Sequence, residues 1–428
     1  MLGCVFVETN CAKYQPRPLD PVHSEAALRA RTPPVKFDPE SLTAFAIRNS
    51  PDVAAAQAKA AGAEAAIVTA RQAVNPSLSA EGGYSRTPDS LATYAISPAF
   101  TIETAGKKGY RILAAKKTAE AARIAVYEAE WQVGSRVRTA LVNYYFALRR
   151  IASLAPERDI RDEIAQIFQK RVELGEASNP EWNAARAEQA AVALTLRTAE
   201  GESSQALAAM AGALSLPASA LEGKTFDLAS FEDPPAPDSL PLRSVEKAGL
   251  LHRADIRRTL VEYEASDARL RLELANRYPN ITLSPAYAFQ EGFPAYTLGS
   301  VIESLPILHR HEGPIAEAEA ARHEVETRFI ALQAQVISET ETALRQYRAA
   351  AADWLAARDS VEVLQKQRER AVMNSFTAGE SNRLDVAEAR LLTVAASRAR
   401  VEAAQRAQTA LGALEDAVQS PLAPGVAN

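Results

Sequence analysis

Two separate stretches of the chain alternate between apolar and polar or small side chains, and a short polar break divides each stretch in two. The first stretch is 76–103 and the second is 279–306. In the second, Leu283, Pro285 and Tyr287 are spaced two residues apart, so they share one side of an extended chain. A period of two predicts β-strands with one apolar face, and each stretch therefore predicts a β-hairpin.

Each predicted strand is about ten residues long, which is the length of a membrane-spanning β-strand. Alternation by itself fits a small soluble sheet that caps a helical domain equally well. If the hairpins lie in a membrane, the four strands of one chain cannot close a barrel, because about eight strands are the minimum and lipid tolerates no open edge. Three copies would then pool their strands in a twelve-stranded barrel.

The segments around the hairpins are rich in alanine and charged residues and poor in glycine, which is typical of helices. We expect one helix from Ser41 to about Val74, a very long helix from Gly106 to about Leu174, and a return helix to about Ala213. At a rise of about 1.5 Å per residue, the long helix approaches 100 Å. The predicted fold class is mainly α with a small β part.

The order of elements occurs twice. Matching residues recur at an offset of 203 positions, as in Asp52 and Asp255, Pro76 and Pro279, and Tyr144 and Tyr347. The offset is 204 for Gly175 and Gly379, and 207 for Gly106 and Gly313. Several matches at a nearly constant offset predict two internal structural repeats.

This repeat predicts the following organisation of the chain. An N-terminal arm, expected to be extended and irregular, is followed by two repeats, a linker between them and a short tail. The boundaries are 1–37 for the arm, 38–220 for the first repeat with a turn at 175–180, 221–238 for the linker, 239–418 for the second repeat with a turn at 378–383, and 419–428 for the tail.

Composition narrows the function classes. The 428 residues carry a net charge of -5, which does not favour a nucleic-acid partner. No apolar run reaches the about 18 residues of a membrane helix, so a membrane crossing is expected to use the strands. The chain contains no phosphate-binding loop, metallohydrolase spacing or nucleophile elbow, and we expect neither an enzyme nor a cofactor.

The two cysteines, Cys4 and Cys11, both lie near the N-terminus. They are either inert thiols in a tail or candidates for lipid modification. The sequence Met-Leu-Gly-Cys resembles the end of a lipoprotein cleavage site, which favours Cys4, whereas Asn10 before Cys11 departs from the small residue expected there. The residues given before the two cysteines include no charged and apolar export signal, so we expect such a signal to lie upstream of the given sequence.

Three segments resemble the TolC-type outer-membrane efflux proteins, with most similarity to their heavy-metal efflux branch. They are A-G-K-K-G-Y-R-I-L-A-A-K after the first hairpin, L-P-I-L-H-R-H-E-G-P-I-A after the second, and S-F-T-A-G-E-S-N-R-L-D-V-A-E-A-R at the second turn. The resemblance covers roughly 40–418. It implies a homotrimer with a β-barrel among the lipids of the outer membrane of a Gram-negative bacterium and an α-helical barrel across the periplasm.

The resemblance also implies partners and a function. A periplasmic adaptor and an inner-membrane pump would deliver substrates, and this chain would form a passive gated exit duct. Heavy-metal cations are the expected cargo, although the same scaffold exports drugs. The alternative is a soluble periplasmic coiled-coil adaptor or a structural scaffold, neither of which accounts for two matched hairpins.

The resemblance further implies that acidic side chains narrow the channel near the turns. The matching positions are Asp385 and Glu388 in the second repeat and Glu181 in the first, where Ala184 replaces the second acid. A ring of carboxylates would attract cations. The alternative is that these residues are ordinary acids in the first turn of a helix, where they interact favourably with the helix dipole.

Other residues near the turns and the second hairpin are weaker candidates. Turn and adaptor-contact residues are expected at Gly175, Gly379, Glu380 and Arg383, and Arg383 is also a candidate ion-pair partner. A metal site would need more ligands than His309, His311 and Glu312 provide. We interpret these three residues as a polar corner between strand and helix and expect no resident metal.

Overall fold

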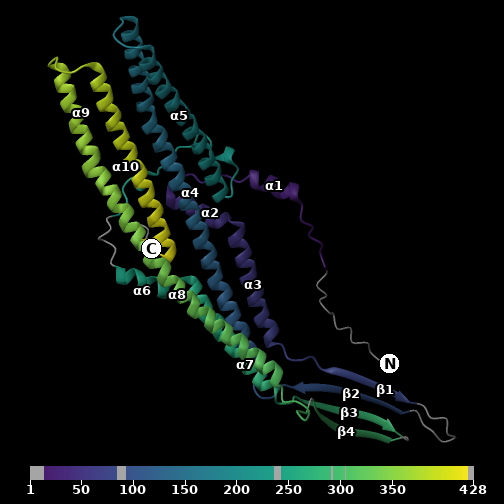
Figure 1. Ribbon diagram of the computed structural model, residues 1–428. Coiled ribbons are helices and arrows are strands. Elements are labelled where there is room, and N and C mark those ends of the chain that lie inside the picture. The colour runs from purple at the N-terminus through teal and green to yellow at the C-terminus, as the bar shows by residue number, and fades with distance from the viewer. Residues whose placement is uncertain (1–13, 84–92, 236–241, 291–292, 304, 423–428) are drawn as a thin grey trace.

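The computed structural model describes residues 14–83, 93–235, 242–290, 293–303 and 305–422. Figure 1 shows an elongated molecule, with four strands at one end and two helix-to-helix turns at the other. The mainly α fold with a small antiparallel sheet is confirmed.

The helices and strands follow one another in the order expected from the sequence pattern. Their bounds are α1 (Pro21–Arg29), α2 (Pro39–Asn49), α3 (Pro51–Arg71), β1 (Ser77–Gly83), β2 (Thr93–Ile102), α4 (Lys107–Glu173), α5 (Asn179–Ala213), α6 (Leu242–His252), α7 (Ala254–Asn276), β3 (Ile281–Gln290), β4 (Phe293–Ile302), α8 (Glu312–Ala356), a π-helical turn (Ala357–Val361), α9 (Glu362–Thr377) and α10 (Arg383–Val418).

The two hairpins join in one antiparallel sheet with the order β1-β2-β3-β4. The register between β2 and β3 places Phe100 opposite Leu283 and Ile102 opposite Ile281. Because side chains alternate between the faces of a strand, this register collects the apolar residues of both hairpins on one face. The outer strands, β1 and β4, each have a pairing partner on one side within the described sheet.

Aromatic side chains cluster on this face near the end of the sheet that lies away from the helices. The rings of Tyr94 and Phe289 stack with centroids 5.3 Å apart, and those of Tyr287 and Tyr296 are also 5.3 Å apart. Such cross-strand pairs stabilise the register of the sheet. Aromatic residues at one end of an apolar face are typical of a membrane interface.

The very long helix α4 organises the helical body. It has 67 residues, spans most of the molecule in Figure 1, and packs against α3, α5, α7 and α10. Two of the groups of buried side chains around it matter for the turns. The central core includes Leu141, Phe146, Met210, Trp354 and Ala404, and the tip core, nearer the turns, consists of Ile160, Ile164, Ala165, Ala185 and Ala387.

The predicted single helix from Ser41 to about Val74 is wrong, because the segment forms two helices. Ser50 has an extended backbone (φ −70°, ψ 126°) between α2 and α3. Proline disfavours the helical conformation in the residue before it, and Pro51 therefore ends α2 at this point. The Ser50 hydroxyl oxygen then caps α3 by accepting from the backbone N–H of Asp52 at 3.2 Å.

Two other segments differ from their expected irregular character. Residues 21–29 of the predicted arm form α1, which Asp20 caps by accepting from the N–H of Val22 at 3.0 Å. In the segment expected to be a linker, Leu221, Leu228 and Phe231 are buried in the central core. Their apolar side chains contact the helices, which gives this segment a packing role in addition to its connecting role.

No helix among the described residues combines the length and the apolar character that a membrane span needs.

Candidate functional site at the helical turns

The turns that end α4 and α9 have the same backbone geometry. Gly175 and Gly379 have φ angles of 73° and 79°, in the left-handed region that glycine adopts without strain. After α4, the N–H of Glu176 donates to the Arg171 carbonyl at 2.7 Å and that of Gly175 to the Val172 carbonyl at 3.0 Å. This pair of hydrogen bonds is the Schellman motif, which reverses the chain at a helix end.

The second turn repeats both hydrogen bonds. Glu380 N–H donates to the Ser375 carbonyl at 2.9 Å, and Gly379 N–H donates to the Phe376 carbonyl at 3.0 Å. The backbone of Glu380 therefore takes part in the helix end. Two apolar side chains near the turns are exposed: Leu174, directly before Gly175, and Phe376, three residues before Gly379.

Two of the three predicted constriction carboxylates cap the helix that follows their turn. Glu181 accepts from the backbone N–H and the hydroxyl of Ser178, both at 2.7 Å, and these bonds hold the pKa of Glu181 below its usual value. Asp385 accepts from the N–H of Asn382 at 2.8 Å, and Asn382 in turn accepts from the N–H of Asp385 at 3.2 Å. Both arrangements are capping boxes, which satisfy otherwise unpaired N–H groups.

Glu388 differs from these two acids because it lies beyond the capped turn of α10 and is exposed to solvent. The three carboxylates therefore lie on both helical pairs close to the turns, but two of them already have a local structural role.

Arg383 links the two helical pairs. Its Nε donates to Glu163 Oε1 on α4 at 2.9 Å, and Arg390 Nη1 donates to the other oxygen of the same carboxylate at 3.3 Å. Glu163 was missed by sequence reasoning. It is 220 positions from Arg383, and only the packing of α4 against α10 brings the two side chains together.

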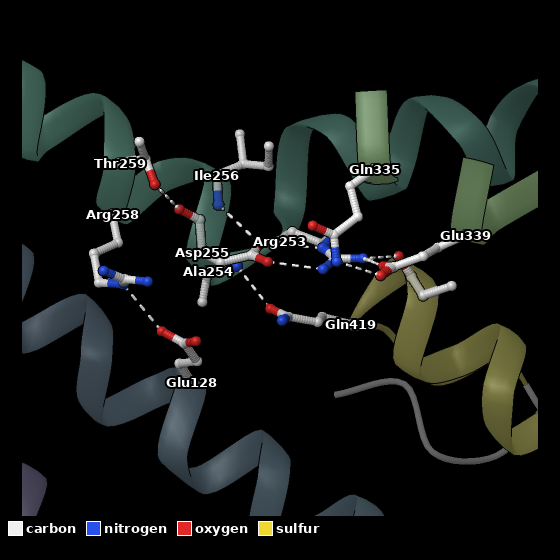
Figure 2. A network of polar contacts seen from close by, with 11 residues as sticks. Glu128, Arg253, Ala254, Asp255, Ile256, Arg258, Thr259, Gln335, Glu339 and Gln419 are labelled. Atoms are coloured by element: carbon white, nitrogen blue, oxygen red, sulfur yellow. Dashed lines mark hydrogen bonds and ion pairs between the residues drawn. The ribbon is translucent and has the colours of Figure 1, made fainter. Parts of the chain in front are cut away.

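A second polar cluster surrounds Arg253, at the junction between α6 and α7 (Figure 2). Its guanidinium donates to both carboxylate oxygens of Asp255, at 3.1 and 2.7 Å. It also donates to Glu339 Oε2 on α8 at 2.9 Å and to the Ala417 carbonyl of α10 at 2.8 Å. The Arg253 side chain is only 8% exposed, and this network joins α7, α8 and α10.

The charges of this cluster depend on one another. Burial favours a higher pKa for Asp255, but the hydrogen bonds and the charge of Arg253 outweigh it and hold that pKa below its usual value. The side chain of Gln419 adds a contact from the end of α10 by accepting from the N–H of Ala254 at 2.7 Å. The cluster was also missed by sequence reasoning, although the repeat of Asp52 in Asp255 was a signal for it.

The remaining candidates lie away from the turns. Cys4 and Cys11 are outside the described residues. His311 begins α8 with a φ of 66° and contacts Glu273 Oε2 through Nε2 at 2.8 Å, as part of a polar corner. Gly106 precedes α4 with a φ of 74°, in the same left-handed region as His311 before α8. His311, and not Gly313, is therefore the structural counterpart of Gly106. Within the described ranges, no three potential metal-ligating side chains gather.

Comparison with known proteins relates this geometry to a family. Residues 43–215 match the family model described as outer membrane efflux protein. The chain is 25% identical over 355 residues to the cobalt-zinc-cadmium resistance protein CzcC of Cupriavidus metallidurans, which covers 82% of each chain.

Solved structures share the fold over nearly the whole length. The outer membrane protein VceC of Vibrio cholerae superimposes with a TM-score of 0.71 at 20% identity, over 90% of this chain and 97% of VceC. The open state of the MtrE outer membrane channel of Neisseria gonorrhoeae gives 0.70 at 16% identity, over 91% of each chain. The family model, the relative and the fold agree that this chain is similar to outer membrane efflux proteins.

Proposed function

We propose that three copies of this chain form a gated duct for metal cations, which runs from the periplasm through the outer membrane. The duct is passive and is a channel and not an enzyme. An inner-membrane pump supplies the energy, and a periplasmic adaptor connects the pump to the helical turns. The exposed apolar side chains of Leu174 and Phe376 near the two turns support docking at this end.

The observation that carries the proposal is the four-stranded sheet with one apolar face and two outer strands. Backbone groups at an open edge cannot remain unpaired in lipid. A second copy can pair β4 with its own β1, and three copies give enough strands for a closed barrel. The helical body, with α4 about 100 Å long, then extends from the membrane as a tube.

Passage of cations is supported by two further observations. The relative CzcC is named a cobalt-zinc-cadmium resistance protein. Glu181, Asp385 and Glu388 would form rings of carboxylates in a threefold assembly, and such rings favour cations over anions. With 5 histidines and 3 methionines in 428 residues, the chain is suited to passage and not to storage of metals.

We also propose that the two halves, 38–220 and 239–418, are structural repeats. Their support is the matching order of a broken helix, a hairpin, a long helix, a glycine turn and a return helix. Such a duplication explains how one chain supplies two hairpins to the sheet and two helical pairs to the tube.

The proposal is tested by planar-bilayer conductance of protein purified in detergent, with the oligomeric mass measured on the same sample. We expect a trimer that gives discrete, cation-selective channels. A detergent-independent monomer without conductance would refute the duct and would favour the soluble adaptor or scaffold.

Introducing a charge on the apolar face of the sheet is expected to impair assembly. Leu283→Arg would place a guanidinium among lipid chains, at a cost of about 2–4 kcal/mol near the bilayer midplane. The matched control is Ser284→Arg, because the next residue of β3 points to the opposite face. The yield of detergent-extracted trimer should fall for the first variant only, and equal yields would contradict the proposed lipid face.

A further inference from the structure

The two long helical segments are irregular at corresponding positions. In α4, Pro156 lies inside the helix and has no N–H, so the carbonyl of Ala152 lacks its usual helical partner. Between α8 and α9, residues Ala357–Val361 form a π-helical turn, in which the hydrogen-bond pattern is wider than in an α-helix. Both features are known sites of bending in long helices.

The repeat offset explains the π-helical turn. Tyr144 and Tyr347 are 203 positions apart, whereas Gly175 and Gly379 are 204 apart, so the second half has one additional residue between these landmarks. A π-helical turn accommodates one additional residue without changing the face that the rest of the helix presents. At either offset, the counterpart of Pro156 falls within Ala357–Val361.

Ion pairs join the helices at this level. Pro156 follows the central core and precedes Ile160 of the tip core. Between the two cores, two ion pairs accompany the buried side chain of Leu154: Glu157 with Arg398 Nη1 at 2.6 Å, and Glu362 with Arg400 Nε at 2.9 Å. Long charged side chains can follow a small movement of the backbone more readily than a close-packed core can.

A cavity of about 140 Å³ adjoins the same level. Ala152 and Ser153 of α4 line it, together with Ser397 and Val401 of α10. The indole Nε1 of Trp354, which is buried one turn before the π-helical turn, has no hydrogen-bond partner among the described residues. The cavity and the unpaired N–H of Trp354 both lower the free-energy cost of a local rearrangement.

We propose that this level is a hinge, at which the outer parts of both helical pairs move while the central core remains fixed. During this movement, the backbone dihedral angles change near Pro156 and in the turn Ala357–Val361. The proposal rests on the gated duct, since the movement would widen or narrow the opening at the turns. It assigns the gate a pivot on α4 about two helical turns before Glu163, the ion-pair partner of Arg383.

Two variants remove the irregularities one at a time. Pro156→Ala restores a backbone N–H in α4, and deletion of Ser360 removes the additional residue of the π-helical turn and restores the offset of 203. The matched control is Gly134→Ala, which stiffens α4 in the central region. Its new Cβ would meet Thr43 Cγ2 at 3.5 Å, an ordinary contact.

The first measurement uses a spin label on Thr377→Cys, in a chain whose two native cysteines are replaced by serine. The distribution of distances between the labels of the three copies is measured in the detergent-extracted trimer. We expect each hinge variant to narrow this distribution about twofold and the control to leave it unchanged. If both hinge variants leave the distribution as broad as in the parent protein, or if the parent distribution is already as narrow as theirs, the hinge is refuted.

The second measurement is single-channel conductance, and it separates the hinge from the duct. We expect openings of the Pro156→Ala trimer to be about tenfold less frequent than those of the parent, with the same conductance in the closed state. Absence of channels in the parent protein would refute the proposed duct. Channels of unchanged opening frequency in Pro156→Ala and in the Ser360 deletion would refute the hinge alone.

Discussion

Replacing Arg253 with methionine is expected to lower the free energy of unfolding by about 3–5 kcal/mol, because it leaves the buried carboxylate of Asp255 without its partner. Asp255 loses two hydrogen bonds and Glu339 loses one. The free carbonyl of Ala417 adds to the loss at the end of α10. Thermal unfolding of the detergent-extracted trimer, followed by circular dichroism, measures the effect.

The chain contains a matched control for this variant. The residues 203 positions before Asp255 and Glu339 are Asp52 and Arg136, which form an ion pair with each other. Their side chains are 62% and 57% exposed, so Arg136→Met is expected to cost at most about 1 kcal/mol. Equal losses for Arg253→Met and Arg136→Met would show that burial does not determine the contribution of the Arg253 cluster.

The same variant has a predicted pH dependence. Arg253 lowers the pKa of Asp255 in the folded chain, and this contribution to stability is present above the unfolded pKa and is lost as the pH falls through the folded pKa. In Arg253→Met, burial without a cation favours the protonated carboxyl. The difference in stability between the two proteins should therefore narrow as the pH falls, first above about 4, where Asp255 becomes protonated in the folded variant, and then below about 4, where the parent loses its contribution. A constant difference would exclude Asp255 as its cause.

Removing the acidic charges near the turns is expected to weaken block by divalent cations about tenfold, because a threefold site loses several negative charges at once. The substitutions are Glu181→Gln, Asp385→Asn and Glu388→Gln in one chain. Amide side chains keep an oxygen acceptor for the capping bonds to Ser178 and Asn382, so the helix starts are preserved. Block of single channels by zinc ions measures the effect.

The control for charge is Glu25→Gln, which removes one exposed carboxylate per chain from α1, far from the turns. It should leave block and cation selectivity unchanged. Asp385→Ala is a useful contrast, since it also removes the cap and should cost about 1 kcal/mol of stability. If the triple variant retains the cation selectivity and zinc block of the parent, the three acids do not act on cations, and Glu181 and Asp385 serve only as helix caps.

The sequence pattern was sufficient for the strands, the long helix and the turns because these depend on local periodicity and on single residues with special backbone properties. Alternation predicted β3, and the glycines at 175 and 379 predicted both turns. The break at Ser50 was also readable from Pro51, although it was not predicted. Local rules of this kind act within a few residues, so they are visible in the chain itself.

Contacts between distant segments needed the tertiary structure. The pairing of Arg383 with Glu163 and of Arg253 with Glu339 depends on how α10 and α8 pack against their neighbours. Alternation also could not decide that β2 pairs with β3, since any two such strands have compatible faces.

What the sequence by itself determined was the repeated order of elements and the chemistry that each element presents. The tertiary structure decided which of those groups meet. It determined which acids cap helices and which arginines are buried. It also placed Pro156 of α4 at the same level as the additional residue in Ala357–Val361. The physical reason is that these properties arise from packing between helices, where distance along the chain has no simple relation to distance in space.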